Sequence, residues 1–314
     1  MKFIRDLKEG DRLFDIYLCK HKQGAVTKNG KPYENVILQD KTGTIDAKVW
    51  EPNNPGIGNY NTLDYIEVHG DVNNFQGNLQ VSIKRIRVCR EEEYNPADYL
   101  PVSEKDISVM FKELKEFIQS IRNPWLKQLL EAFFVRDEAF AKAFCYSSAA
   151  KTVHHGFVGG LLEHTLSVTK LCDYYCKVYP ILKRDLLLTA AMCHDIGKVK
   201  ELSLFPENDY TDDGQLLGHI VMGSQMVAEK AAQIADFPHV QLVQLQHCIL
   251  AHHGKYEYGS PKLPALMEAL ALNYADDTDA KLETFREILE NSSANQGWLG
   301  FNRLFESNLR ATKE

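Results

Sequence analysis

The sequence predicts two domains, a small N-terminal β-barrel followed by an all-α domain. At 314 residues the chain is long enough to build two hydrophobic cores. Over much of the first 90 residues apolar and polar side chains alternate, which is the period of half-buried strands. Beyond a polar stretch at residues 91–102 the period changes to that of amphipathic helices. This change of period predicts the domain boundary.

Five segments of the first domain have strand character, and glycine-containing turns separate several of them. They are residues 12–20, 33–40, 44–50, 64–72 and 79–88. In the last segment the apolar phase shifts, so we expect a β-bulge near Lys84 and Arg85. Five short strands in so small a segment favour a closed barrel of the OB type, which we assign to residues 1–90.

Helical periodicity begins after the connector, which is polar and flanked by proline and forms the predicted linker at residues 91–102. Ser103 with Asp106 resembles a capping box, and the apolar stripe of the first helix ends before Pro124. Further helices are predicted at residues 125–134, 138–146, 161–178, 184–195, 218–235, 239–253 and 263–276.

The helical domain is assigned to residues 103–314, with its motif core at about residues 150–280. Gly197 and Gly254 each follow a predicted helix, where a left-handed C-cap is favoured. The fold class is therefore multidomain, with β-structure first and α-structure second.

The composition indicates in which compartment the protein resides and limits what it can bind. No apolar run approaches the roughly 20 residues that span a bilayer, and the charged N-terminal segment does not resemble a secretion signal, so we expect no membrane association. The seven cysteines include no Cys-x-x-Cys pair, which favours free thiols in a reducing cytoplasm. Because the net charge is −7, binding of nucleic acid would need local positive charge or bound metal ions.

The most informative motif is the adjacent pair His194-Asp195, which closes an apolar helix. Polar groups at the end of a buried helix need partners, and a carboxylate beside an imidazole can bridge two metal ions. Other potential ligands flank the pair, each about one helix and one connection from the next. They are His164, His219, His252, His253 and Asp276. Mixed nitrogen and oxygen ligands suit Mn, Fe, Zn or Mg, and two such ions side by side hydrolyse phosphoesters.

Any single histidine on an amphipathic helix is more often structural than metal-binding, so the prediction depends on the joint pattern. His239 and His247 do not fit the spacing and are interpreted as structural. Asp279 is expected to be a helix N-cap and Asp277 to be solvated. Lys198 lies one helical turn beyond the His-Asp pair, and it is either a point charge that meets a substrate phosphate or a solvated lysine.

These positions resemble the HD superfamily of metal-dependent phosphohydrolases, and the additional histidines resemble its two-metal branch. The segment from His154-His155-Gly156 to His164-Thr165-Leu166-Ser167-Val168 is more specific. Together with the barrel it resembles the YhaM-type 3′-to-5′ exoribonucleases of Gram-positive bacteria, over essentially the whole chain. The resemblance implies an OB-fold joined to an all-α HD domain and manganese-favoured removal of nucleotides from the 3′ ends of single-stranded RNA, with single-stranded DNA as a further substrate.

The resemblance also implies which side chains act. His164, His194, Asp195 and Asp276 hold the first ion. Asp195 bridges to a second ion held by His219 and His252, with His253 as a further ligand. Two divalent ions are expected, Mn²⁺ by preference, with Fe, Mg, Co or Zn as alternatives. Asp195 and Lys198 are the expected catalytic residues, and activated water releases a nucleoside monophosphate.

OB-folds bind single strands by stacking bases on aromatic rings and by placing basic groups along the phosphates. The candidate nucleic-acid contacts are the aromatic residues Tyr33, Trp50, Tyr65 and Phe75 and the basic residues Lys84, Arg85, Arg87 and Arg90. Alternatively, the aromatic rings fill the barrel core and the basic groups form a solvated strand face. His155 either contacts a phosphate or packs in the helical domain.

Two other functions stay open. A phosphohydrolase of free nucleotides or cyclic dinucleotides needs no barrel, and the helical domain contains no Gly-Tyr-Pro signature of the cyclic-dinucleotide branch. A non-catalytic DNA-binding accessory factor of replication needs no such set of ligands. For the tail at residues 291–314 three roles are open: packing on the helical domain, mediating a homo-oligomer, or lining an RNA path.

Overall fold

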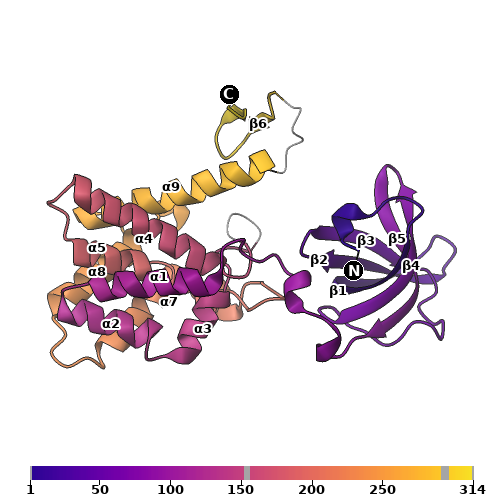
Figure 1. Ribbon diagram of the computed structural model, residues 1–314, viewed down its shortest axis with the longest axis horizontal. Coiled ribbons are helices and arrows are strands. Elements are labelled where there is room, and N and C mark those ends of the chain that lie inside the picture. The colour runs from indigo at the N-terminus through magenta and orange to yellow at the C-terminus, as the bar shows by residue number, and fades with distance from the viewer. Residues whose placement is uncertain (1, 152–155, 291–296, 313–314) are drawn as a thin grey trace. The chain divides into compact units, whose positions relative to one another are not determined.

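The computed structural model describes residues 2–151, 156–290 and 297–312. It divides into two compact units, Met1–Val102 with Phe205–Asn208, and Ser103–Leu204 with Asp209–Glu314 (Figure 1). The first unit is built on a closed β-barrel and the second on helices, so the predicted fold class is confirmed.

The barrel contains the five predicted strands. They are β1 (Arg12–Val26), β2 (Pro32–Asp40), β3 (Gly43–Val49), β4 (Tyr65–Phe75) and β5 (Asn78–Val88), in the order β1-β2-β3-β5-β4. Neighbouring strands are antiparallel except β3 and β5, which run parallel. Inward-facing side chains such as Leu38, Ile66 and Val81 are fully buried, as the alternating pattern requires.

The predicted bulge lies in β5. His69 of β4 pairs with Arg85, whereas the next residue, Gly70, pairs with Ile83, so Lys84 is the extra residue. A side chain at position 70 would meet the Ser82 carbonyl oxygen at 2.5 Å, which explains the glycine there.

The connector packs on the barrel through two short 3₁₀ helices, η2 (Glu91–Glu93) and η3 (Pro96–Asp98). The Tyr94 ring stacks on Tyr65 with 3.8 Å between centroids, and Gln39 donates a hydrogen bond to the Tyr99 carbonyl at 3.1 Å. Residues 91–102 are therefore grouped with the barrel in the first unit.

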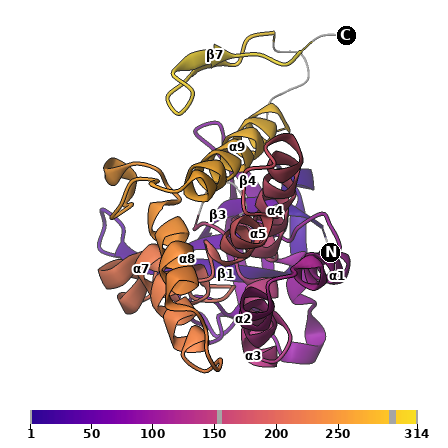
Figure 2. The same ribbon diagram turned by 90° about the vertical axis from the view of Figure 1, so that its left-hand side faces the viewer.

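The second unit is a bundle of helices. They are α1 (Ile107–Ser120), α2 (Pro124–Phe134), α3 (Glu138–Tyr146), α4 (Gly160–Val178), α5 (Arg184–Cys193), α6 (Lys198–Glu201), α7 (Asp212–Ala231), α8 (His239–Ala251) and α9 (Met267–Glu290). Figure 2 shows α4, α5 and α9 side by side, and α5 also packs against α2 and α8. A short hairpin, β6 (Gly300–Asn302) with β7 (Ser307–Leu309), was not expected from the sequence.

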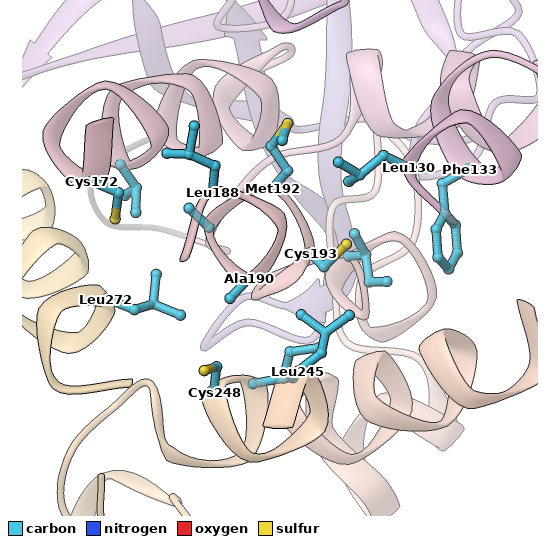
Figure 3. Close-up of a cluster of buried hydrophobic side chains, with 14 of the residues drawn as sticks. Leu130, Phe133, Cys172, Leu188, Ala190, Met192, Cys193, Leu245, Cys248 and Leu272 are labelled. Atoms are coloured by element: carbon cyan, nitrogen blue, oxygen red, sulfur yellow. The ribbon is translucent and has the colours of Figure 1, made fainter. Parts of the chain in front are cut away.

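The core of this unit surrounds α5. Figure 3 shows its side chains meeting those of the neighbouring helices, with Cys172, Leu188, Ala190, Met192, Cys193, Leu245, Cys248 and Leu272 labelled. Every residue from Leu187 to Cys193 is fully buried, so the last residues of α5 have no solvent to face. Polar groups that follow at this end must find partners inside the protein.

Two of the predicted helix signals are corrected, and a third is confirmed. Asp106 alone caps α1, accepting hydrogen bonds from the amides of Ser108 and Val109, while Ser103 donates to Glu163 instead. Gly197 has right-handed helical geometry and no left-handed cap, whereas Gly254 has the expected positive φ of 75°. The physical requirement at position 197 is space, since a Cβ atom would lie 2.1 Å from the His219 carbonyl oxygen.

The boundaries of two other helices also differ from the prediction. α7 begins at Asp212 and passes through a kink at Gly218, the residue at which the helix was predicted to start. α9 continues to Glu290, beyond its predicted end at Asp276.

All seven cysteines are free thiols. In the described part of the chain no helix combines the length and the apolar character that a membrane span requires.

Candidate metal centre and nucleic-acid interface

The seven predicted ligands come together inside the helical unit. His164 lies on α4, His194 and Asp195 follow α5, His219 lies on α7, His252 and His253 follow α8, and Asp276 lies on α9. They form two groups, His164 with His194 and Asp276, and His219 with His252 and His253. Within each group, one potential ligand atom of every residue lies within 4.8 Å of the others. Each group is therefore compact enough to hold one metal ion.

Asp195 lies between the two groups. Its Oδ2 atom is 3.6 Å from His164 Nε2 and 3.4 Å from His194 Nε2. Its Oδ1 atom is 3.4 Å from His219 Nε2 and 3.7 Å from His252 Nε2. One carboxylate thus directs one oxygen toward each group, which is the arrangement of a bridging ligand.

Three of the five histidines are oriented by main-chain carbonyls. The Nδ1 atoms of His194, His252 and His253 donate to the carbonyls of Ala191, Ile249 and Tyr258 at 2.8, 2.7 and 2.7 Å. Because a carbonyl only accepts, the proton is on Nδ1 and the lone pair is on Nε2. This tautomer leaves Nε2 ready to bind a metal ion.

The other two histidines are oriented by carboxylates. Asp279 Oδ2 is 2.7 Å from His164 Nδ1, and Glu201 Oε1 is 2.9 Å from His219 Nδ1. Glu201 Oε1 also accepts the His219 amide at 3.0 Å. A carboxylate behind a histidine fixes the ring and raises its basicity as a ligand.

Asp279 is thus not the helix N-cap that was predicted. It lies inside α9, three residues after Asp276, so both carboxylates face the same side of the helix. The three-residue spacing could have indicated that Asp279 faces the centre, but the prediction that the helix ends at Asp276 excluded this interpretation. Glu201 lies on α6, a short helix that the sequence did not reveal, and no comparable signal pointed to it.

Several polar atoms at the centre fit a metal ion better than they fit protein alone. Asp195 Oδ1, His219 Nε2 and His252 Nε2 are buried and make no hydrogen bond to any described residue. Buried polar atoms without partners are costly, and these three atoms are of the types that bind divalent cations. The donor set is therefore suited to metal ions.

The electrostatics of the centre agree with this. Burial would lower the pKa of His164, but hydrogen bonds to Asp276 and Asp279 outweigh it and raise the pKa to about 10. The carboxylates around this ring therefore attract positive charge, which a bound metal ion would supply in place of the proton. Burial, together with neighbouring His253 and His194, holds the pKa of His252 well below its ordinary value, so this ring is neutral, as a ligand must be.

Lys198 is held beside the bridging carboxylate, with its Nζ atom 2.7 Å from Asp195 Oδ2. Burial opposes its charge, but Asp195 raises the pKa of Lys198 above the ordinary value, so the side chain is cationic. It lines a cavity of about 400 Å³ with His164, Asp195, His253 and Asp276. The lysine is therefore not a solvated residue at a helix end.

Comparisons with known proteins give one match within the helical unit and others over most of the chain. The HD domain family model matches residues 161–281. The 3′-5′ exoribonuclease YhaM of Geobacillus sp. (strain WCH70) is 38% identical over 280 residues, covering 88% of this chain and 85% of the relative. YhaM of Bacillus subtilis (strain 168) is 36% identical, covering 90% and 88%. The chain belongs to the YhaM 3′-5′ exoribonuclease family. The match to the HD domain implies binding of divalent metal.

Among solved structures, the second OB-fold domain of replication protein A from Methanococcus maripaludis is similar to part of this YhaM family member. The sequence identity is 20%, and the match covers 29% of this chain and 95% of that one, with a TM-score of 0.24.

The barrel of this YhaM family member exposes some of the predicted aromatic contacts. Trp50 is 50% exposed and stacks on Tyr33, with 5.3 Å between ring centroids. Lys48, which was not predicted, lies 5.7 Å from the Tyr33 ring. Phe75 is 59% exposed at the end of β4. Tyr65, by contrast, is half-buried against the connector, so its face is not available to a base.

Three of the four predicted basic contacts lie on β5, and they differ in their partners; the fourth, Arg90, is exposed beyond the end of that strand. Lys84 pairs with Asp71. Arg87 pairs with both Glu67 and Glu93, at 2.6 and 2.9 Å. Arg85 is exposed and forms no ion pair with any described residue. Of the three, Arg85 therefore offers the least compensated positive charge.

The remaining predicted positions are structural or lie elsewhere. His247 Nε2 accepts the Ala265 amide at 2.9 Å, and His239 is exposed at the start of α8, as expected for residues outside the metal centre. Asp277 is half-exposed and pairs with Lys281 at 2.8 Å. His155 lies outside the described residues.

Proposed function

We propose that this protein is a metal-dependent 3′-to-5′ exoribonuclease that hydrolyses single-stranded RNA to nucleoside monophosphates. The observation that carries the proposal is the position of Asp195, with one oxygen toward each group of histidines. The relatives named 3′-5′ exoribonuclease match over most of their length and over most of this chain, which supports the same reaction here. The attached barrel supports a polymeric substrate, because an enzyme that acts on free nucleotides would not need it.

In this proposal His164, His194 and Asp276 hold one ion, His219, His252 and His253 hold the other, and Asp195 bridges them. The mixed nitrogen and oxygen donors and the family favour Mn²⁺, with Fe, Mg, Co or Zn as alternatives. When bound, such a pair of ions activates water and offsets the negative charge of the phosphate.

The chain's own residues orient the reaction. Asp279 and Glu201 hold the rings of His164 and His219, so the ligand atoms keep their positions. Lys198, cationic and in the cavity, offsets charge on the phosphate oxygens. The cavity of about 400 Å³ suits a single terminal nucleotide rather than a duplex.

The barrel unit is proposed to bind the RNA strand and the helical unit to cut it. Trp50 stacked on Tyr33 offers a platform for a base, Phe75 a second one, and Arg85 a phosphate contact. The seven free thiols support a reducing compartment such as the cytoplasm.

The proposed function is tested with single-stranded RNA labelled at either end and incubated with Mn²⁺. A ladder that shortens only from the 3′ end, with nucleoside monophosphates as products, is the expected result. Exclusive hydrolysis of free nucleotides or cyclic dinucleotides would instead favour the small-molecule alternative. Binding without any product would favour the accessory factor, and a single-stranded DNA substrate tests the second proposed polymer.

Asp279→Ala is expected to weaken binding of Mn²⁺ by about 10- to 100-fold, because His164 loses the carboxylate that fixes its ring. Asp279→Asn keeps an acceptor and should lose less. Titration calorimetry measures the affinity without reference to turnover. Asp277→Ala, on the same helix, is the control and should bind Mn²⁺ as the wild type does. Unchanged affinity in Asp279→Ala would refute the orienting role.

Arg85→Ala is expected to weaken binding of single-stranded RNA and to reduce the salt dependence of the affinity by about one phosphate contact. Arg87→Ala is a matched control on the same strand, since the charge of Arg87 is already compensated by Glu67 and Glu93. Fluorescence anisotropy at several salt concentrations separates the two variants. Equal losses in both would count against a specific contact by Arg85.

A further inference from the structure

Tyr258 is an exposed aromatic residue at the catalytic cavity. It ends the 3₁₀ helix η4 (Tyr256–Tyr258), which follows α8 and the histidine pair. Tyr258 is 58% exposed, yet it lines the same cavity as Asp195 and Lys198. Among the described residues that line this cavity, it is the only tyrosine, phenylalanine or tryptophan. Because the ring is largely exposed, packing in the hydrophobic core does not explain why a tyrosine lies at this position.

The turn that carries Tyr258 is anchored to the metal centre. Its carbonyl oxygen accepts the Nδ1 proton of His253 at 2.7 Å. Gly259, in a left-handed conformation with φ of 85°, ends the turn, and the Ser260 amide closes it by donating to the Lys255 carbonyl at 3.3 Å. The backbone of Tyr258 therefore has a defined position relative to a histidine of the second group.

The surroundings of the ring suit a flat, polarisable ligand. The Lys255 ammonium lies 5.0 Å from the ring centroid, close enough for a cation–π contact. Asn273, another polar residue of the cavity wall, donates its side-chain amide to the His252 carbonyl at 2.7 Å. That amide is engaged in holding the centre together, so the aromatic ring is the better candidate to meet a base.

We propose that Tyr258 is the stacking platform for the base of the 3′-terminal nucleotide while its phosphate lies at the metal centre. The inference rests on the proposed function and deepens it, because it names the part of the substrate that this wall of the cavity binds. Stacking uses the face that every nucleobase has, so the platform accepts all four bases. It therefore suits an enzyme that removes nucleotides one after another whatever their sequence.

The test compares two ligands that differ only in the base, AMP and ribose 5-phosphate, on the Mn²⁺-loaded protein. We expect the wild type to bind AMP roughly tenfold or more tightly than ribose 5-phosphate, as stacking of one base predicts. Tyr258→Ala should abolish that preference and leave the affinity for ribose 5-phosphate unchanged, and Tyr258→Phe should retain it. Tyr256→Ala is the matched control, since Tyr256 is 64% exposed in the same turn and does not line the cavity.

A second readout uses RNA with an ordinary or an abasic 3′-terminal nucleotide. Tyr258→Ala should raise KM on the ordinary end roughly tenfold and change it little on the abasic end. Equal losses on both ends, or an undiminished preference for AMP in Tyr258→Ala, would overturn the inference. Turnover of RNA by the wild type reports separately on the proposed function, because the AMP preference does not depend on it.

Discussion

Asp195→Asn is expected to lower hydrolysis of single-stranded RNA on the order of 10³-fold or more. The substitution keeps the size of the side chain but removes the negative charge that lies between the two groups of histidines. It also leaves the buried ammonium of Lys198 without its carboxylate partner. Both proposed metal sites are affected by one change, which is why this is the largest single-residue effect that the structure predicts.

The measurement is single-turnover hydrolysis of RNA labelled at its 5′ end, with binding of the same RNA followed by anisotropy. Binding should stay within about a factor of two, because the proposed contacts along the RNA strand in the barrel unit and the proposed stacking on Tyr258 are unchanged. Asp213→Asn, exposed in the first turn of α7, is the control and should hydrolyse RNA as the wild type does. Full turnover by Asp195→Asn would refute the proposed centre.

Removal of divalent cations by EDTA is expected to stop hydrolysis and to lower the melting temperature of the helical unit on the order of 5–10 °C for each ion lost. The stabilisation arises because ions at about 100 times their Kd bind the folded state and not the unfolded chain. In addition, Asp195 Oδ1, His219 Nε2 and His252 Nε2 would lose the partner that their burial requires. Calorimetry before and after addition of Mn²⁺ measures the shift.

Two histidine variants distinguish stabilisation by Mn²⁺ bound at the centre from a general effect of the cation on the melting temperature. His252→Ala removes a ligand of the second group and should reduce the gain in melting temperature on addition of Mn²⁺. His247→Ala removes a histidine that bonds the Ala265 amide outside the centre, and it should keep the gain. The same melting temperature with and without Mn²⁺, or full activity in EDTA, would contradict a metal-dependent mechanism.

Much of the fold was predictable because periodicity is a local property. Alternation located the five strands, and the shift of phase between Ile83 and Ile86 located the bulge at Lys84. The ends of helices were less predictable. The polar run Asp276–Asp279 resembled a helix end followed by a cap, but α9 continues through it to Glu290, and Asp279 meets His164 of another helix.

The sequence by itself indicated the seven candidate ligands but not Asp279 or Glu201. Polar side chains such as His194 and Asp195 at the end of a buried apolar helix need a common partner, and this requirement can be read from the sequence. Only the tertiary structure decided how they are used. It divided the histidines between the two oxygens of Asp195, put Asp279 behind His164, and distinguished Arg85 from the paired Arg87. The physical reason is that spacing along a chain specifies which face a residue occupies, whereas ion pairs and hydrogen bonds depend on distances between elements that are far apart in sequence.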